Sequence, residues 1–285
     1  MRVGRIPYVN CYPVYGAIDR GIVPLAADLV DGVPTALNAQ MEAGTLDLSV
    51  VSAVEYARNA RRYLLLPDLA ISCDGPVRSV ALFSKRPAQE LDGCRVIVSR
   101  SSMTSVALLE LLFEDVWHAR PQLVPGDAEP ADLERLGAEP HDARLVIGDA
   151  ALLLAARRNA SGTPPSGSAS PYQYVHDLGS AWKEWTGLPF VFAVWVAQRT
   201  VAVERALEVY AALATSRDWG LHHLDALADQ ATHATGVDLR TCNEYLSGLD
   251  YGLSYAHLAG LTEFLRRLVA AGRVPNGSLA FLPAA

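Results

Sequence analysis

The chain has 285 residues, of which 51% are hydrophobic and 19% are charged, and its formal net charge is −7. This composition supports a packed core and excludes an intrinsically disordered chain. An acidic chain also lacks the basic surface that nucleic-acid-binding proteins use, and it would not attract an anion from a distance. Any anionic ligand must therefore be held by groups close to it.

Four cysteines are widely spaced, and none has a histidine at a metal-ligand spacing: Cys11, Cys73, Cys94 and Cys242. This pattern favours reduced thiols over a disulfide framework or a structural zinc site. The residues from Met1 onward lack the features of a secretion signal, and no run reaches the roughly 18 apolar residues that cross a bilayer. We therefore expect a cytoplasmic protein with no nucleic-acid or membrane partner.

The opening stretch joins an apolar run at residues 1–6 to a predicted helix at residues 15–19. A loop at the carboxyl end of an interior strand is where open α/β sheets bind ligands. Prolines stiffen this loop, and Asn10 offers hydrogen-bond donors and an acceptor without titrating. The alternative is an ordinary strand-to-helix connection with a turn-forming Asn.

Strands and helices then alternate, which is typical of a mostly parallel sheet with covering helices. Two apolar runs at residues 64–72 and 78–83 interrupt the alternation, which restarts near Leu91. The further predicted strands are 25–30, 46–51, 94–98, 122–124, 143–147, 172–175 and 190–195. The predicted helices are 34–44, 52–58, 106–117, 131–136, one from 148, 179–185, 201–216, 221–232, 239–246 and 257–271. Residues 159–171 are rich in Ser, Gly and Pro and predict a surface loop.

This order of elements predicts two α/β lobes with a ligand cleft between them, the type II periplasmic-binding-protein-like fold. The first lobe is expected to comprise residues 1–86 together with 196–285, whose helices form a tail that packs on it. The second lobe is expected to comprise residues 87–195. The strands near 78–84 and 190–196 would join the two.

Several polar turns are expected to face that cleft. The cluster Ser102, Thr104 and Ser105 stands at a helix start and offers hydroxyls and free backbone N–H groups to a carboxylate or phosphate. Ser52 occupies the equivalent turn of the first lobe, and Ser79 follows Arg78 at the start of a crossover strand. Plain alternatives remain open: an N-cap for Ser52 and the Ser102 cluster, a strand residue for Ser79 and a helix cap for Asp149.

In combination, these motifs resemble the chorismate dehydratase family. The resemblance rests on residues 5–13, 44–47, 52–56, 78–80, 102–105, 147–152, 177–182 and 186–193, with a looser echo at Tyr245, Leu246 and Tyr251. It implies a cytoplasmic lyase that needs no cofactor and starts the futalosine route to menaquinone. The implied reaction converts chorismate to 3-[(1-carboxyvinyl)oxy]benzoate and water.

The resemblance also implies the site residues. Asn10 and Ser79 would be catalytic, and the substrate would be bound by Tyr8, Ser52, Arg78, Ser102, Thr104, Ser105 and Asp149, with no metal. Because the predicted site offers hardly any titratable group, the base would be either the enolpyruvyl carboxylate of the substrate or Asp149. We favour the substrate carboxylate, oriented by Asn10 and Ser79.

Three other readings stay open at this point. A solute-binding protein of this fold would normally carry an export signal, and a regulator's effector domain would need a DNA-binding helix-turn-helix in front. The sister enzyme of the same pathway, which forms 1,4-dihydroxy-6-naphthoate, has a different opening loop of the Cys-Pro-Asn-Asp type. The sequence leaves open whether the protein is a monomer or a homodimer.

Overall fold

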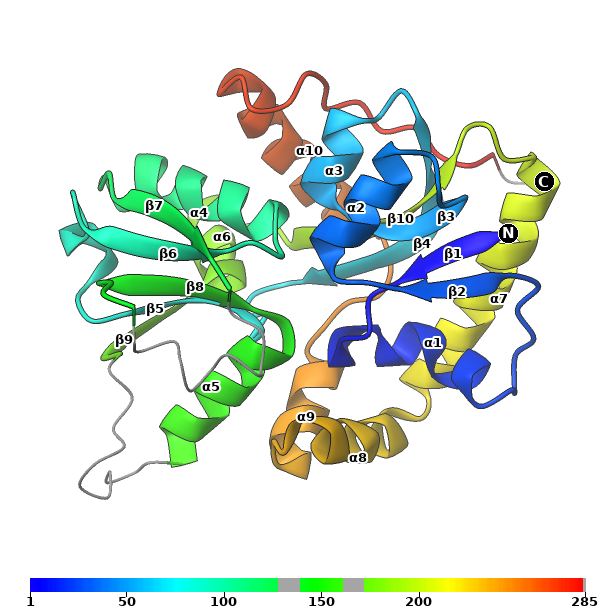
Figure 1. The fold of residues 1–285 in the computed structure, drawn as a ribbon, viewed down its shortest axis with the longest axis horizontal. Coiled ribbons are helices and arrows are strands. Elements are labelled where there is room, and N and C mark those ends of the chain that lie inside the picture. The colour runs from blue at the N-terminus through cyan, green and yellow to red at the C-terminus, as the bar shows by residue number, and fades with distance from the viewer. Residues whose placement is uncertain (128–138, 161–171, 284–285) are drawn as a thin grey trace.

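The structure of the protein, a computed structural model, describes residues 1–127, 139–160 and 172–283. The helix expected at residues 131–136 and most of the loop expected at 159–171 lie outside these residues. Within the described ranges the chain forms two five-stranded sheets, which lie side by side in two lobes (Figure 1).

The first sheet has the strand order β2-β1-β3-β10-β4. Its strands are β1 (Arg2–Arg5), β2 (Asp28–Asp31), β3 (Leu48–Ser52), β4 (Tyr63–Cys73) and β10 (Phe190–Gln198). β1 pairs in parallel with β2 and β3, whereas β10 runs antiparallel to both β3 and β4. The sheet is therefore mixed rather than mostly parallel, because the chain returns to it from the other lobe in the opposite direction.

The second sheet has the strand order β7-β6-β8-β5-β9. Its strands are β5 (Val80–Ser84), β6 (Arg95–Ser99), β7 (Gln122–Gly126), β8 (Ala143–Ile147) and β9 (Tyr174–Asp177). β6 pairs in parallel with β7 and β8, and β5 is antiparallel to β8 and β9. Every residue of β5 and β8 is buried, which explains their largely apolar sequences; Ser84 and Arg144 are the buried polar residues of these two strands.

The chain passes between the sheets after β4 and again before β10. β5 therefore pairs within the second sheet and β10 within the first. The division expected from sequence, at residues 86/87 and 195/196, differs from these pairings by about one strand at each crossover. Both strands are almost entirely buried, and a continuous apolar run does not indicate which sheet it joins.

Local signals set several helix boundaries. Pro34 lies in the first turn of its helix, and Gly44 follows that helix with a φ of +70°. The Asp177 carboxylate accepts the Ser180 N–H at 2.9 Å to begin another helix, which Gly187 ends in the left-handed region. The described helices before residue 190 are α1 (Tyr12–Asp19), α2 (Pro34–Glu42), α3 (Ala53–Arg58), α4 (Thr104–Asp115), α5 (Gly148–Ala160), α6 (Leu178–Thr186) and the 3-10 turns η1 (Val9–Cys11) and η2 (Ala88–Glu90).

The C-terminal part is helical, as expected, with α7 (Val203–Leu221), α8 (Leu224–Thr235), α9 (Leu239–Ser247) and α10 (Tyr255–Ala270). α7 packs closely on α1, where a Cβ on Gly220 would lie 2.2 Å from the Pro13 carbonyl oxygen. α10 packs on β10, and a Cβ on Gly260 would lie 2.0 Å from the Pro189 carbonyl oxygen. Glycine at both positions lets these helices approach the first lobe.

The two lobes share apolar packing. One cluster of buried side chains includes Val50 of β3, Leu108 of α4, Trp182 of α6 and Phe264 of α10. The rings of Trp182 and Phe264 meet edge to face with centroids 5.9 Å apart, so α10 contacts the second lobe as well as the first. This shared packing holds the lobes together around the space between them.

Candidate active site

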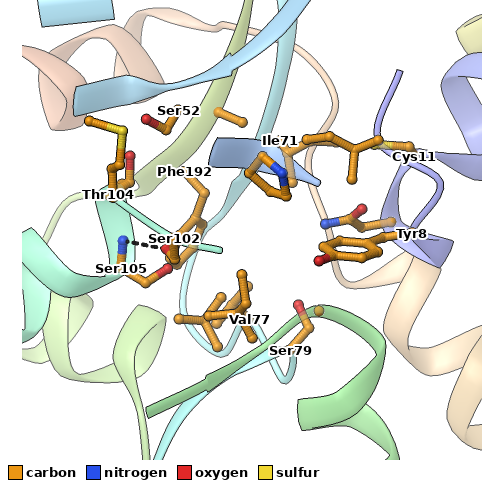
Figure 2. A pocket seen from close by; sticks show the side chains of 18 residues that line it. Tyr8, Cys11, Ser52, Ile71, Val77, Ser79, Ser102, Thr104, Ser105 and Phe192 are labelled. Atoms are coloured by element: carbon orange, nitrogen blue, oxygen red, sulfur yellow. Dashed lines mark hydrogen bonds between the residues drawn. The ribbon is translucent and has the colours of Figure 1, made fainter. Parts of the chain in front are cut away.

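A pocket lies between the lobes and receives side chains from both (Figure 2). Among the residues expected at the site, those that line it are Tyr8, Asn10, Ser52, Ser79, Ser102, Thr104 and Ser105. Figure 2 shows the Ser102, Thr104 and Ser105 side chains at one end and Tyr8 with Cys11 at the other. Cys11, Val77 and Phe192 add lining that the sequence analysis did not single out.

The loop after β1 meets the start of α5 from the opposite lobe. The Val9 N–H donates to Asp149 Oδ1 at 3.0 Å, and the Tyr8 ring lies against Gly148. A Cβ on Gly148 would be 3.0 Å from two ring carbons, and its φ of +61° also favours glycine. Because Asp149 contacts the backbone beside Asn10 and does not line the described pocket, its visible role is to anchor this loop across the lobe boundary.

The side chain of Asn10 has a buried oxygen. Its side-chain Oδ1 has no hydrogen-bond partner among the described residues. Such an oxygen loses its water without a replacement, at a cost of about 1–3 kcal/mol. Because Asn10 lines the pocket, a ligand that donates a hydrogen bond there would remove that cost.

Ser52 is the N-cap of α3, and its hydroxyl oxygen accepts the Glu55 N–H at 3.1 Å. The amide of Asn38 donates to the same oxygen at 3.2 Å and accepts the Ser52 N–H at 3.2 Å. The plain N-cap reading of Ser52 is therefore correct, yet it does not exclude a binding role. With its lone pairs occupied, the hydroxyl can offer only its hydrogen to a ligand.

The Ser102 cluster at the start of α4 is arranged in the same way. Ser102 Oγ accepts the Ser105 N–H at 3.2 Å, and Thr104 Oγ1 accepts the N–H of Val54, in α3 of the first lobe, at 3.2 Å. The Asn38 amide also reaches Met103 Sδ at 3.1 Å. These contacts tie α2 and α3 to α4 and leave the hydroxyl hydrogens of Ser102 and Thr104 available as donors.

The segment before β5 sets the direction of Ser79. The Asp177 carboxylate accepts the N–H of Val77 at 3.0 Å and that of Arg78 at 2.6 Å. Arg78 has a φ of +61°, a strained conformation for a residue with a side chain, and the two hydrogen bonds hold it. Ser79 follows with only 2% of its surface exposed and lines the pocket.

The guanidinium of Arg78 does not take part in the pocket lining within the described residues. It pairs with Glu244 of α9 at 2.9 Å, and 41% of the side chain is exposed. This geometry therefore does not place the Arg78 guanidinium in contact with a substrate in the pocket. Arg78 acts here through its backbone, which orients Ser79.

Ionisable groups are scarce in the pocket. Among its described lining residues, those that titrate are Tyr8 and Cys11. Burial, together with the charge of Asp149, raises the pKa of the Cys11 thiol, so it stays protonated at neutral pH. The lining is thus a set of neutral hydroxyl and amide groups with an apolar remainder.

Two residues near the pocket were not predicted as site residues from the sequence. Asn38 is 2% exposed in the middle of α2, between Leu37 and Met41, which are also buried. A polar residue within a buried helix stripe is the signal that could have identified it. Tyr245 of α9 lies close to Ser79, as discussed below, and only the resemblance at residues 245–246 pointed to it.

Within residues 1–127, 139–160 and 172–283, no cluster of His, Cys, Asp and Glu has a composition suited to a metal ion. In the same residues, no helix combines the length and apolar character needed to cross a bilayer.

Comparisons with known proteins identify the family and the fold of the chain. The family model described as menaquinone biosynthesis matches residues 1–270. A Thermus thermophilus protein named chorismate dehydratase is 34% identical over 273 residues, which cover 92% of this chain and 95% of the relative.

Solved structures show the fold. A protein from Archaeoglobus fulgidus superposes with a TM-score of 0.75 at 21% identity, covering 96% of this chain and 98% of that one. The alkanesulfonate-binding protein of Xanthomonas axonopodis gives 0.68 at 12% identity, covering 98% and 96%. The predicted periplasmic-binding-protein-like fold is thereby confirmed. On the match over residues 1–270 and the identity to the Thermus relative, the chain belongs to the menaquinone biosynthesis family.

Proposed function

We propose that this protein is a chorismate dehydratase, which converts chorismate to 3-[(1-carboxyvinyl)oxy]benzoate and water. Membership of the menaquinone biosynthesis family and the similarity to the Thermus enzyme support the proposal. The observation that carries it is the pocket between the lobes, which presents neutral hydroxyl hydrogens and an unpaired amide oxygen but no carboxylate or cationic side chain among its described lining residues.

The chemistry of chorismate suits such a pocket. Chorismate carries two carboxylates, and the hydrogen on its ether-bearing carbon is acidified by conjugation to the ring carboxylate. Loss of that proton and of the neighbouring hydroxyl produces an aromatic ring, which drives the reaction forward. The enzyme then needs preorganised donors where negative charge accumulates more than it needs a strong base, and one such donor is worth about 10²–10³ in rate.

Existing hydrogen bonds make the hydroxyls of the pocket donors towards a ligand. Backbone N–H groups already fill acceptor positions on Ser52, Ser102 and Thr104. Their hydrogens are left for an anion, and the positive end of α4 lies beside two of them. In the proposed complex the Ser102 cluster holds the ring carboxylate, with Ser52 contributing from the first lobe. These local donors serve a protein whose net charge of −7 repels anions.

The proposed elimination uses the substrate as its own base. The enolpyruvyl carboxylate takes the proton from the carbon to which its ether oxygen is attached, while Ser79 donates a hydrogen bond to the departing hydroxyl. The same proton then converts the departing hydroxide to water, so no proton is gained or lost overall. Asn10 orients the enolpyruvyl group through its amide N–H groups, which can donate to the carboxylate. The contact of Asp149 with Val9 supports this scheme, because it gives that carboxylate a structural role.

The proposal includes a setting as well. We place the reaction in the cytoplasm, at the start of the futalosine route to menaquinone, without nucleic-acid or membrane partners. The protein works as a monomer or a homodimer, and light scattering during gel filtration distinguishes these two states.

The direct test is incubation of the purified protein with chorismate, followed by ultraviolet spectroscopy and proton NMR. We expect chorismate to disappear as the aromatic signals of 3-[(1-carboxyvinyl)oxy]benzoate appear in equal amount, and an Asn10→Ala variant should be nearly inactive. Chorismate that binds but stays intact would instead indicate a binding protein, and no interaction at all would refute the assignment.

A further inference from the structure

Two tyrosines in and after α9 have buried hydroxyl groups without a hydrogen-bond partner in the part of the chain that the structure describes. Tyr245 in α9 is 1% exposed, Tyr251 beyond α9 is 2% exposed, and neither hydroxyl has a hydrogen-bond partner among the described residues. Phenylalanine would fill the same space without the cost of about 1–3 kcal/mol for a buried unpaired hydroxyl. Native structures rarely keep such groups without a use for them.

The two hydroxyls lie in different surroundings. Burial raises the pKa of Tyr245, and the Ser79 side chain lowers it, as a neighbouring hydrogen-bonding group does. The Ser79 hydroxyl is thus close to that of Tyr245, although the pair does not reach full hydrogen-bond geometry. Burial also raises the pKa of Tyr251, whose other polar neighbours are Tyr245, Cys11 and Asp250 rather than Ser79.

A side-chain ion pair holds α9 beside the segment that carries Ser79. Glu244 of α9 pairs with Arg78 at 2.9 Å, one residue before Tyr245 and Ser79 respectively. The Arg78–Glu244 ion pair is partly exposed, whereas Ser79 and Tyr245 are buried. Arg78 itself is held in its strained conformation by the Asp177 carboxylate, so the backbone that carries Ser79 is restrained beside α9.

We propose that Tyr245 is a positioning residue for Ser79: its hydroxyl, already close to Ser79 Oγ without substrate, donates to that oxygen and directs the Ser79 hydrogen at the departing hydroxyl group of the substrate. The inference rests on the proposed dehydration, in which Ser79 is that donor. A serine hydroxyl rotates freely unless a donor occupies its lone pair, as backbone N–H groups do for Ser52, Ser102 and Thr104. Ser79 has no such backbone donor in the described structure, and Tyr245 supplies the missing one.

The test compares Tyr245→Phe with Tyr251→Phe, a matched control that removes a similarly buried hydroxyl whose polar neighbours do not include Ser79. We expect Tyr245→Phe to lower kcat about tenfold, the rate equivalent of one hydrogen bond, with KM unchanged and folding intact. Tyr251→Phe should keep kcat within about twofold. Equal kcat in Tyr245→Phe and the wild type, or an equal loss in both variants, would overturn the proposal.

A double-mutant cycle with Ser79→Ala shows whether Tyr245 acts through Ser79. Two quantities are measured for each variant, kcat with chorismate and the denaturant midpoint of unfolding. We expect the Tyr245→Phe substitution to have no further effect on kcat once Ser79 is alanine, and the unfolding midpoints to be non-additive. Additive effects in both quantities would disprove the link. Failure of the wild type to convert chorismate would refute the proposed function, while the unfolding cycle would still decide whether the two hydroxyls interact.

Discussion

Asp149 is the one carboxylate that competes with the substrate for the role of base, and its substitution separates the two mechanisms. In the structure Asp149 Oδ1 accepts the Val9 N–H at 3.0 Å. Asp149→Asn keeps an oxygen acceptor for that N–H and removes the charge. A hydrogen bond to a charged acceptor is worth about 1.5–3 kcal/mol and one to a neutral acceptor about 0.5–1.5, so the loss is about 1 kcal/mol.

If Asp149 only anchors the loop that carries Asn10, kcat of Asp149→Asn should fall by less than about tenfold. If it removes the proton, the loss should reach about 10²–10⁴, since an amide cannot act as a general base. Asn10→Ala should cost about 10²–10³ in kcat in either case, because it removes an orienting group from the pocket.

Asp149→Ala is the matched comparison, because it also leaves the Val9 N–H without an acceptor. We expect it to be less stable than Asp149→Asn by about 1–3 kcal/mol and to be the less active of the two. Steady-state kinetics with chorismate and urea unfolding measure both effects. A kcat loss of more than about 10³ in Asp149→Asn, with unchanged affinity for the product, would refute the substrate-assisted scheme and make Asp149 the base.

Two other predictions follow from the pocket and from the packing beneath it. Replacing Ser102, Thr104 and Ser105 together by alanine removes donors from a carboxylate, so product binding measured by calorimetry should weaken by at least about 100-fold. The control Ser247→Ala, at an exposed position of α9, should bind the product normally. Unchanged affinity in the triple variant would mean that the cluster is only a helix cap. Burial raises the pKa of Glu55 more than hydrogen bonds from Tyr63 and Asn59 lower it, so its contribution to stability is present in acid and is lost as the pH rises through the raised pKa. Glu55→Gln keeps an acceptor oxygen and cannot ionise, so its melting temperature relative to the wild type should increase from about pH 4 to about pH 7, and a pH-independent difference would contradict this reasoning.

Much of the secondary structure could be predicted because its signals are local. A cap acts within three or four residues, as Ser52 does on Glu55 and Asp177 on Ser180, and glycine at position 187 ends a helix by its own backbone preference. The strand at residues 143–147 was predicted with its observed bounds, since a short buried run between polar turns leaves little choice. The helix from residue 15 in fact starts at Tyr12, because the 3-10 turn η1 leads directly into it.

The roles within the candidate site were harder to predict because they depend on contacts between distant residues. Nothing near Arg78 in the chain indicates that its side chain pairs with Glu244, 166 residues away, rather than with a ligand. The Asp149 carboxylate finds its partner 140 residues away at Val9. A motif shows which residue types meet at a site, whereas the direction of each side chain follows from backbone angles and from packing.

The sequence by itself determined the class of fold, the positions of most elements and the set of neutral polar residues at the carboxyl ends of strands. These properties depend on composition, periodicity and caps, which act over a few residues. Only the tertiary structure decided which sheet β5 and β10 join, and that Asn38 and Tyr245 stand behind Ser52 and Ser79. Both crossover strands are buried apolar runs, and the polar contacts form only after the lobes have come together, so their free energy depends on burial that a linear pattern does not contain.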